Sequence, residues 1–154
     1  TKDDIDFNQL VHKTISNLSH IDEFNNVSFN INISEGLKVN SNLQLISSML
    51  QNIIQNAIKY KRPFNATHTP FIIISAFKTN TGYKICIKDN GIGINKNELD
   101  KVFKLYYRSH NNVDGTGLGL YITKNIVEQL NGTITVQSIE NEMTQFDINL
   151  PNTI

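Results

Sequence analysis

This sequence has one cysteine, two arginines and a net charge of zero. The single cysteine and the balanced charge each exclude a class of protein. Cys86 is the single cysteine among 154 residues, so the chain cannot form an internal disulfide. It lies in the alternating run YKICIKD, where we expect a small buried hydrophobic residue of the core, in a reducing compartment. Fourteen basic and fourteen acidic residues balance. Nothing in the overall charge therefore favours nucleic acid or an anionic membrane surface, and any anion site must be local.

Long apolar segments are also missing. The sequence has no apolar run long enough to span a bilayer, and its first residues, TKDDIDFNQL, lack the shape of a signal peptide. We expect a soluble, cytoplasmic and monomeric unit, and the membrane topology of any parent protein is left open. The length predicts one domain over residues 1–154. The 22 asparagines against two arginines reduce the weight of any motif built from asparagine.

Hydrophobic spacing predicts a mixture of helices and strands. Helical spacing and strict alternation follow one another along the chain, and several strands pair through short turns rather than through regular βαβ crossovers. The predicted elements are a helix at 6–19, a strand at 27–33, a helix from Ser41 until Pro63 forbids continuation, strands at 71–78 and 82–89, a helix at 116–130 closed by Gly132, and strands at 132–138 and 144–151. This order indicates an α/β two-layer sandwich, a mixed and mostly antiparallel sheet with helices on one face.

A glycine-rich turn, GTGLGL, opens the helix predicted at 116–130. Its glycines let backbone N–H groups approach a ligand, and a helix start offers unpaired donors and the positive end of the helix dipole. The pattern matches neither the Walker P-loop nor the dinucleotide fingerprint. Many glycine-rich turns bind nothing, so by itself this turn is only a candidate phosphate site.

A second glycine cluster, DNGIGI, follows the strand at 82–89. A partly buried Asp89 can accept a hydrogen bond from an exocyclic amine such as that of adenine, and it selects against a carbonyl there. Gly91 and Gly93 permit a flat surface to come close to the backbone. DNG is equally an ordinary turn sequence, and that alternative stays open.

A polar stripe interrupts the long apolar helix. Asn52, Asn56, Lys59 and Tyr60 fall at spacings that place them on one helical face. Amide oxygens can ligate a hard cation, a lysine can neutralise phosphate, and a tyrosine can cover an aromatic ring. The stripe therefore combines three groups that a metal-bound nucleotide requires.

Four segments together resemble a known family. NIIQNAIKY, DNGIGI, VFKLYYR and GTGLGL are similar, in order and spacing, to the N box, the first glycine box, the F box and the second glycine box of the ATP-binding catalytic domain of bacterial sensor histidine kinases. These kinases fall within the GHKL superfamily, with gyrase and the mismatch-repair ATPases. The resemblance covers nearly the whole chain. It implies the Bergerat ATP-binding fold, with a flexible ATP lid at about 94–115.

The resemblance also implies roles for individual residues. Asn56 would ligate Mg²⁺, Lys59 would lie near the phosphates, Tyr60 would lie against the adenine and Asp89 on its amino group, and Arg108 would reach the terminal phosphates when the lid closes. Thr144, in MTQF, would support Asp89, with Met143 in place of the family's glycine and a modest change in the turn. The remaining implied nucleotide contacts are Asn52, Gly91, Gly93, Ile94, Gly115, Thr116, Gly117, Leu118, Gly119 and Leu120.

The residue one turn before Asn56 separates two chemistries within this superfamily. Members that hydrolyse ATP resemble one another in a glutamate there, whereas this chain has Asn52, which cannot act as a general base. Transfer to a neutral imidazole needs mainly position and charge neutralisation, so Asn52, Lys59 and Arg108 are the predicted catalytic residues of a protein-histidine kinase.

The expected phosphate acceptor and its partners lie outside this sequence. Neither His12 nor His20 has the context of the family's acceptor histidine, and both are predicted to be surface residues. The expected partners are ATP, a dimerisation domain of the same parent protein that carries the acceptor, and a downstream response regulator. Two alternatives stay open: a nucleotide-binding signalling module without catalysis, and an anti-sigma-type serine kinase of the same superfamily.

Overall fold

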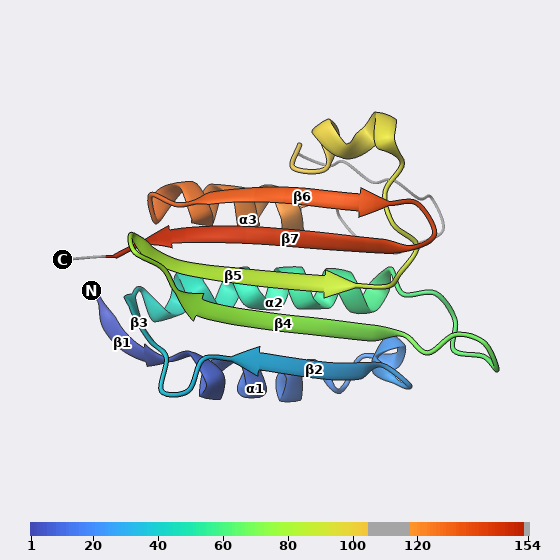
Figure 1. Cartoon of the computed structure of the whole chain (residues 1–154), viewed down its shortest axis with the longest axis horizontal. Coiled ribbons are helices and arrows are strands. Elements are labelled where there is room, and N and C mark those ends of the chain that lie inside the picture. The colour runs from blue at the N-terminus through green and yellow to red at the C-terminus, as the bar shows by residue number, and fades with distance from the viewer. Residues whose placement is uncertain (105–117, 153–154) are drawn as a thin grey trace.

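The computed structural model describes residues 1–104 and 118–152 as two layers, a sheet and the helices that cover one of its faces (Figure 1). The main sheet has the strand order β2-β4-β5-β7-β6, with bounds Ser28–Ile33, Phe71–Lys78, Gly82–Asp89, Met143–Pro151 and Thr133–Ile139. The helices are α1 (Phe7–Leu18), α2 (Leu43–Lys59) and α3 (Gly119–Gln129), with short 3₁₀ helices η1 (Asp22–Phe24) and η2 (Lys96–Lys101).

The direction of the strands confirms the predicted sheet. β2 runs parallel to β4, whereas β4–β5, β5–β7 and β7–β6 are antiparallel. All three α-helices lie behind the sheet in the view of Figure 1, which confirms the two-layer arrangement. Within the described part of the chain, no helix has the length and apolar character that a membrane span requires.

The core forms between the inner face of the sheet and the apolar faces of the helices. α2 contributes more of it than any other element, since seven of its residues are buried: Ile46, Met49, Leu50, Ile53, Ile54, Ala57 and Ile58. Inner residues of the central strands, among them Ile74, Ile85 and Ile148, are fully buried against this face. Their burial removes apolar surface from water at about 25 cal/mol per Å², so α2 is fixed over the middle of the sheet.

A second, two-stranded sheet was missed by the sequence analysis. β1 (Asp3–Asp6) pairs antiparallel with β3 (Lys38–Ser41). Ser41 belongs to β3, which corrects the predicted start of the long helix. The helix begins at Leu43 because the Asn42 side chain accepts the Leu45 N–H at 3.0 Å, a standard N-cap.

The predicted C-terminal cap of α3 also needs correction. Asn131, not Gly132, adopts the left-handed conformation, with φ at 61°. The Asn131 N–H bonds to the Glu128 carbonyl and the Gly132 N–H to the Val127 carbonyl, both at 2.9 Å, which is the Schellman pattern. Glycine is required at 132 for another reason: a Cβ there would lie 2.4 Å from the Asn149 carbonyl oxygen.

Cys86 does not lie in the core, contrary to the prediction. Its neighbours Ile85 and Ile87 are buried against the helices, so by strand alternation Cys86 faces the outer side of the sheet, where it is partly exposed. Asp147 is its cross-strand partner on β7. Desolvation, with the adjacent Asp147 carboxylate, raises the pKa of the Cys86 thiol to about 11.

This environment predicts an unreactive thiol. At pH 8 we expect Cys86 in the folded protein to be alkylated roughly 10²-fold more slowly than in urea, because only the thiolate reacts. Asp147→Asn should accelerate the reaction in the folded protein, and Cys86→Ser is the blank. Timed iodoacetamide labelling followed by mass spectrometry measures the rates, and equal rates for folded and unfolded protein would refute the assignment.

Candidate functional site

Asp89 is the last residue of β5 and points to the inner, helix-covered side of the sheet. Only 7% of it is exposed, and its Oδ1 accepts the Gly91 N–H at 2.8 Å. Burial raises the pKa of Asp89 to about 6, although the hydrogen bond from Gly91 opposes the rise. A carboxylate can accept further hydrogen bonds beyond this one. The sheet therefore holds a desolvated acceptor at the end of β5.

Thr144 and Ser138 extend this acceptor into a row across three strands. Thr144 on β7 is the register partner of Asp89 on β5 and of Ser138 on β6. Thr144 is 6% exposed, and its hydroxyl lies 2.9 Å from that of Ser138. Directly opposed residues share a face of the sheet. Sequence analysis gave Thr144 a supporting role but missed Ser138, which no local pattern distinguishes.

The glycines of DNGIGI make room for the protein's own backbone. A Cβ at Gly91 would lie 2.5 Å from the Tyr60 carbonyl oxygen, and a Cβ at Gly93 would lie 2.2 Å from that of Ile139. Gly93 also has a φ of +69°, which side chains rarely adopt. Internal backbone contacts thus require glycine at both positions. The approach of a flat ligand surface to this segment stays a prediction.

The end of α2 is tied directly to this segment. The Ile92 N–H donates to the Tyr60 carbonyl at 3.0 Å, so the C-terminal turn of α2 meets the loop after β5. The other predicted residues of the polar stripe are all half-buried along α2, beside its apolar face. They are Asn52, Asn56 and Lys59. The structure therefore brings the N box and the first glycine box together at one end of the sheet.

Two residues near this junction were missed by the sequence analysis. The Asn90 side chain accepts the Phe71 N–H at 2.8 Å and donates to the Thr69 carbonyl at 3.0 Å. Arg62 donates through Nε to the Asn90 carbonyl at 3.1 Å. These bonds fix the exit of β5 to the entry of β4, so Asn90 holds Asp89 in place from outside the site.

The start of α3 supplies the other glycine-rich turn. Leu118, the N-cap residue, contributes no side-chain cap, so the first N–H groups of the helix are not closed off by it. No atom of the described residues lies within 4 Å of a Cβ built at Gly119. Leu120 packs partly against the core. The predicted contacts at Arg108, Gly115, Thr116 and Gly117 lie outside the described residues.

The first part of the predicted lid packs on the body of the domain. Ile94 and Val102 are 9% and 3% exposed. The Phe103 ring meets Phe146 edge-on, with centroids 6.2 Å apart, and the Lys124 amine lies 5.4 Å from the Phe103 centroid. Residues 94–104 are therefore anchored to the sheet and to α3, while 105–117 lie outside the described part of the chain.

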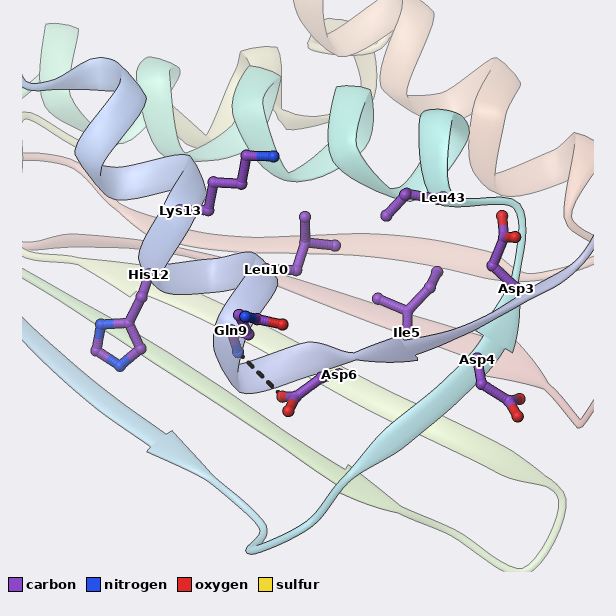
Figure 2. Close-up of a pocket in the computed structure, with 9 residues that line it drawn as sticks. All are labelled: Asp3, Asp4, Ile5, Asp6, Gln9, Leu10, His12, Lys13 and Leu43. Atoms are coloured by element: carbon purple, nitrogen blue, oxygen red, sulfur yellow. Dashed lines mark hydrogen bonds between the residues drawn. The ribbon is translucent and has the colours of Figure 1, made fainter.

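A groove of about 690 Å³ lies at the opposite end of α2 (Figure 2). It is lined by Asp3, Asp4, Ile5, Asp6, Gln9, Leu10, His12, Lys13 and Leu43. Leu43 is the first residue of α2, whereas Tyr60 follows its last. At 1.5 Å per residue the two ends lie about 25 Å apart. None of the lining residues is a predicted nucleotide contact, so the groove is separate from the candidate site.

Comparison with known proteins shows the family of this chain. The family described as histidine kinase-, DNA gyrase B-, and HSP90-like ATPase matches residues 41–154. Among curated proteins, a sensor protein kinase WalK of Staphylococcus haemolyticus is 36% identical over 98% of this chain and 25% of its own length. A sensor histidine kinase AtsR of Burkholderia thailandensis is 34% identical over 75% of this chain and 19% of its own. This chain thus spans a quarter or less of these relatives.

Solved structures show the same fold. The catalytic domain of the histidine kinase ThkA superposes with a TM-score of 0.83 at 23% identity, over 100% of this chain and 99% of that one. The mycobacterial sensor histidine kinase MprB gives 0.82 at 20% identity, over 98% and 97%. The chain belongs to the family of histidine kinase-, DNA gyrase B-, and HSP90-like ATPases. Within it, the resemblance to histidine kinase catalytic domains is confirmed.

Proposed function

We propose that this chain is the catalytic domain of a sensor histidine kinase, which binds ATP and presents its γ-phosphoryl group to a histidine on a separate dimerisation domain. The observation that carries the proposal is the buried carboxylate of Asp89, held at the end of β5 beside the polar end of α2. Among the described residues no cation pairs with this carboxylate, so the burial of a hydrogen-bond acceptor there needs another explanation, and binding of an exocyclic amine supplies one. The pairing favours adenine over guanine.

The polar stripe of α2 fits the phosphates and their metal ion. Asn52 and Asn56 offer amide oxygens, which are the hard ligands that Mg²⁺ accepts, and Mg²⁺ usually takes only one or two protein ligands together with phosphate oxygens and water. In our assignment Asn56 is the ligand, and Lys59 neutralises phosphate charge. Bound there, Mg²⁺ would offset the negative charge of the phosphates during transfer.

The chain's own residues then position the nucleotide. Asp89 and Thr144 orient the adenine, Tyr60 covers it, and the glycine-rich turn before α3 receives the phosphates at a helix start. The Cβ position of Gly119 is clear of all described atoms, which supports that approach. Arg108 would complete the grip on the terminal phosphates. Asn52 cannot deprotonate water, so hydrolysis is slow, and the transferred group goes to an imidazole nitrogen that is already nucleophilic.

Several partners follow from this role. A structural neighbour, the full-length ShkA, was solved in complex with AMPPNP and superposes with a TM-score of 0.83 over 98% of this chain and 31% of that one. By analogy this chain, as one monomeric domain over 1–154, would work beside an acceptor-carrying dimerisation domain and pass the phosphoryl group on to a response regulator. The ATP supply places it in the cytoplasm, whether or not the parent protein is anchored to a membrane.

Calorimetric titration tests the proposal. A non-hydrolysable ATP analogue should bind in the presence of Mg²⁺, more weakly without it, and at least about tenfold more tightly than the matching GTP analogue. A dimerisation domain from a relative, supplied in trans with ATP, should then acquire acid-labile phosphohistidine. Absence of binding up to millimolar analogue, or equal affinity for both purines, would rule out the proposed function.

A further inference from the structure

The hydroxyl of Ser138 stands at the centre of a small hydrogen-bond network on the inner face of β6. It donates to the Met143 carbonyl at 2.7 Å, accepts the Ile94 N–H at 2.7 Å, and lies 2.9 Å from the Thr144 hydroxyl. These three groups belong to different parts of the candidate site. Ile94 opens the predicted lid, Met143 begins β7, and Thr144 lies opposite Asp89.

The chemistry of the partners fixes the direction of every bond. A serine hydroxyl has one proton and two lone pairs. A carbonyl can only accept, so the Ser138 proton is committed to Met143, and an amide N–H can only donate, so Ile94 takes one lone pair. Ser138 can therefore meet Thr144 only as an acceptor. The Thr144 hydroxyl is the donor of the 2.9 Å bond.

This direction decides what Thr144 presents to a ligand. Since its proton points to Ser138, its oxygen turns only lone pairs toward the Asp89 side. Asp89 and Thr144, register partners on adjacent strands, then form a pair of acceptors on one face of the sheet. A purine with an amine at C6 satisfies two acceptors, whereas a purine with a carbonyl at C6 meets only lone pairs.

The same residue also ties down the first lid segment. The Asn141 N–H donates to the Ile92 carbonyl at 2.6 Å, and the backbone of Gly93 lies against Ile139 and Glu140. Together with the bond from Ile94 to Ser138, these contacts seat residues 92–94 on the turn between β6 and β7. The first residues of the predicted lid are therefore held in place, and the Ser138 hydroxyl that holds Ile94 also contacts Thr144 at the proposed adenine site.

We propose that Ser138 is a positioning residue that sets purine selectivity, by holding the Thr144 hydroxyl as an acceptor, while it anchors the first lid segment through Ile94. This inference rests on the proposed function. The role falls to a residue on β6 that acts through Thr144 and Ile94. It also predicts that selectivity and lid anchoring change together when one hydroxyl is removed.

The test compares the affinities of two non-hydrolysable triphosphate analogues, with the adenine amine or with the carbonyl of hypoxanthine at C6. In Ser138→Ala the Thr144 proton is released and can serve the carbonyl, so the preference for the amine should fall about tenfold. Thr135→Ala, on the exposed side of the same strand, is the matched control and should retain the wild-type ratio. A ratio within twofold of wild type in folded Ser138→Ala would overturn the proposal.

A double-mutant cycle separates this role from general loosening of the site. If Ser138 acts through the Thr144 hydroxyl, adding Ser138→Ala to Thr144→Val should change the ratio less than about twofold. An equal change in both backgrounds would contradict the proposal. Should Ser138→Ala not fold, Ser138→Cys replaces the hydroxyl by a somewhat larger and much weaker hydrogen-bonding group, and the same ratio applies to it.

A measurement on the nucleotide-free protein separates failure of this inference from failure of the proposed function. Amide hydrogen exchange at Ile94 should become at least about tenfold faster in Ser138→Ala and stay unchanged in Thr135→Ala. Unchanged exchange would overturn the anchoring role. If the wild-type chain binds neither analogue, the proposed function fails and purine selectivity with it, whereas the exchange rate still decides whether Ser138 anchors the lid segment.

Discussion

Asp89→Asn is expected to lower the preference for adenine over guanine nucleotides by roughly 10²-fold, the value of one hydrogen bond to a buried charged group. An asparagine offers a donor as well as an acceptor, so it can serve the guanine carbonyl that the carboxylate rejects. Calorimetric titration with the two non-hydrolysable analogues measures the ratio. Asp147→Asn is the matched control, since Asp147 is equally buried at 6% exposure but faces the outer side of the sheet. A wild-type ratio in Asp89→Asn would refute the adenine assignment.

The pKa of Asp89 gives the same prediction a pH dependence. Burial raises this pKa to about 6, so the carboxylate that accepts the adenine amine becomes protonated below that value. Affinity for the adenine analogue should fall up to about tenfold per pH unit between pH 6 and 5 in the wild type and much less in Asp89→Asn. A flat profile in the wild type would contradict the role of the ionised carboxylate.

The contribution of Asp89 to the free energy of unfolding should become more favourable as the pH falls, whereas the affinity for the adenine analogue decreases. A carboxyl whose folded pKa lies above its unfolded value destabilises the fold when it is ionised, and the penalty disappears as the pH falls through about 6 toward the unfolded value. The shift corresponds to a penalty on the order of 3 kcal/mol at pH 7. Asp89→Asn keeps the acceptor for Gly91 and should raise the free energy of unfolding at pH 7. A urea titration checks this, and the gain should vanish near pH 4.

Asn56→Ala is expected to remove the Mg²⁺-dependent part of nucleotide affinity. Binding in the presence of Mg²⁺ should fall to the level measured without it, because the side-chain ligand is lost. The fold should be unaffected, since the Asn56 bond to the Tyr60 N–H comes from its backbone carbonyl and alanine favours a helix. Gln51→Ala, exposed on the same helix, is the control. Wild-type affinity of Asn56→Ala for the Mg²⁺-bound analogue would exclude Asn56 as the metal ligand.

Local pattern was sufficient for the longer strands and insufficient for the short ones. The apolar run at 71–78, the alternating run at 82–89 and the turn between them predicted β4 and β5 with the bounds that the structure shows. β1 and β3 were missed because a four-residue strand with a single apolar residue carries almost no period, and these two strands exist only because distant segments pair. Cys86 was misplaced for a related reason: alternation gives the period of a strand, and only the packed structure decides which face a given residue takes.

In the candidate site, too, residues with a local sequence pattern could be predicted and residues that depend on distant contacts could not. The roles of Asp89 and of the polar stripe on α2 could be predicted because each depends on a few adjacent residues or on residues at one helical spacing. Ser138 could not, because a serine in an alternating strand carries no signal until residue 94 is brought against it. The role of Asn90 could not be predicted because DNG is also an ordinary turn sequence. Its side-chain hydrogen bonds to Thr69 and Phe71 depend on the packing of β4 beside β5.

The parallel pairing of β2 with β4 has a consequence for the unfolded chain. Ser28 pairs with Phe71, and all of α2 lies between them, whereas Lys78 pairs with Tyr83 across one tight turn. Closing the longer loop loses about 2 kcal/mol more chain entropy than closing the hairpin, since this loss grows with the logarithm of loop length. The β4–β5 hairpin is therefore the less demanding contact for a disordered chain, and β2 joins it at the higher entropic cost.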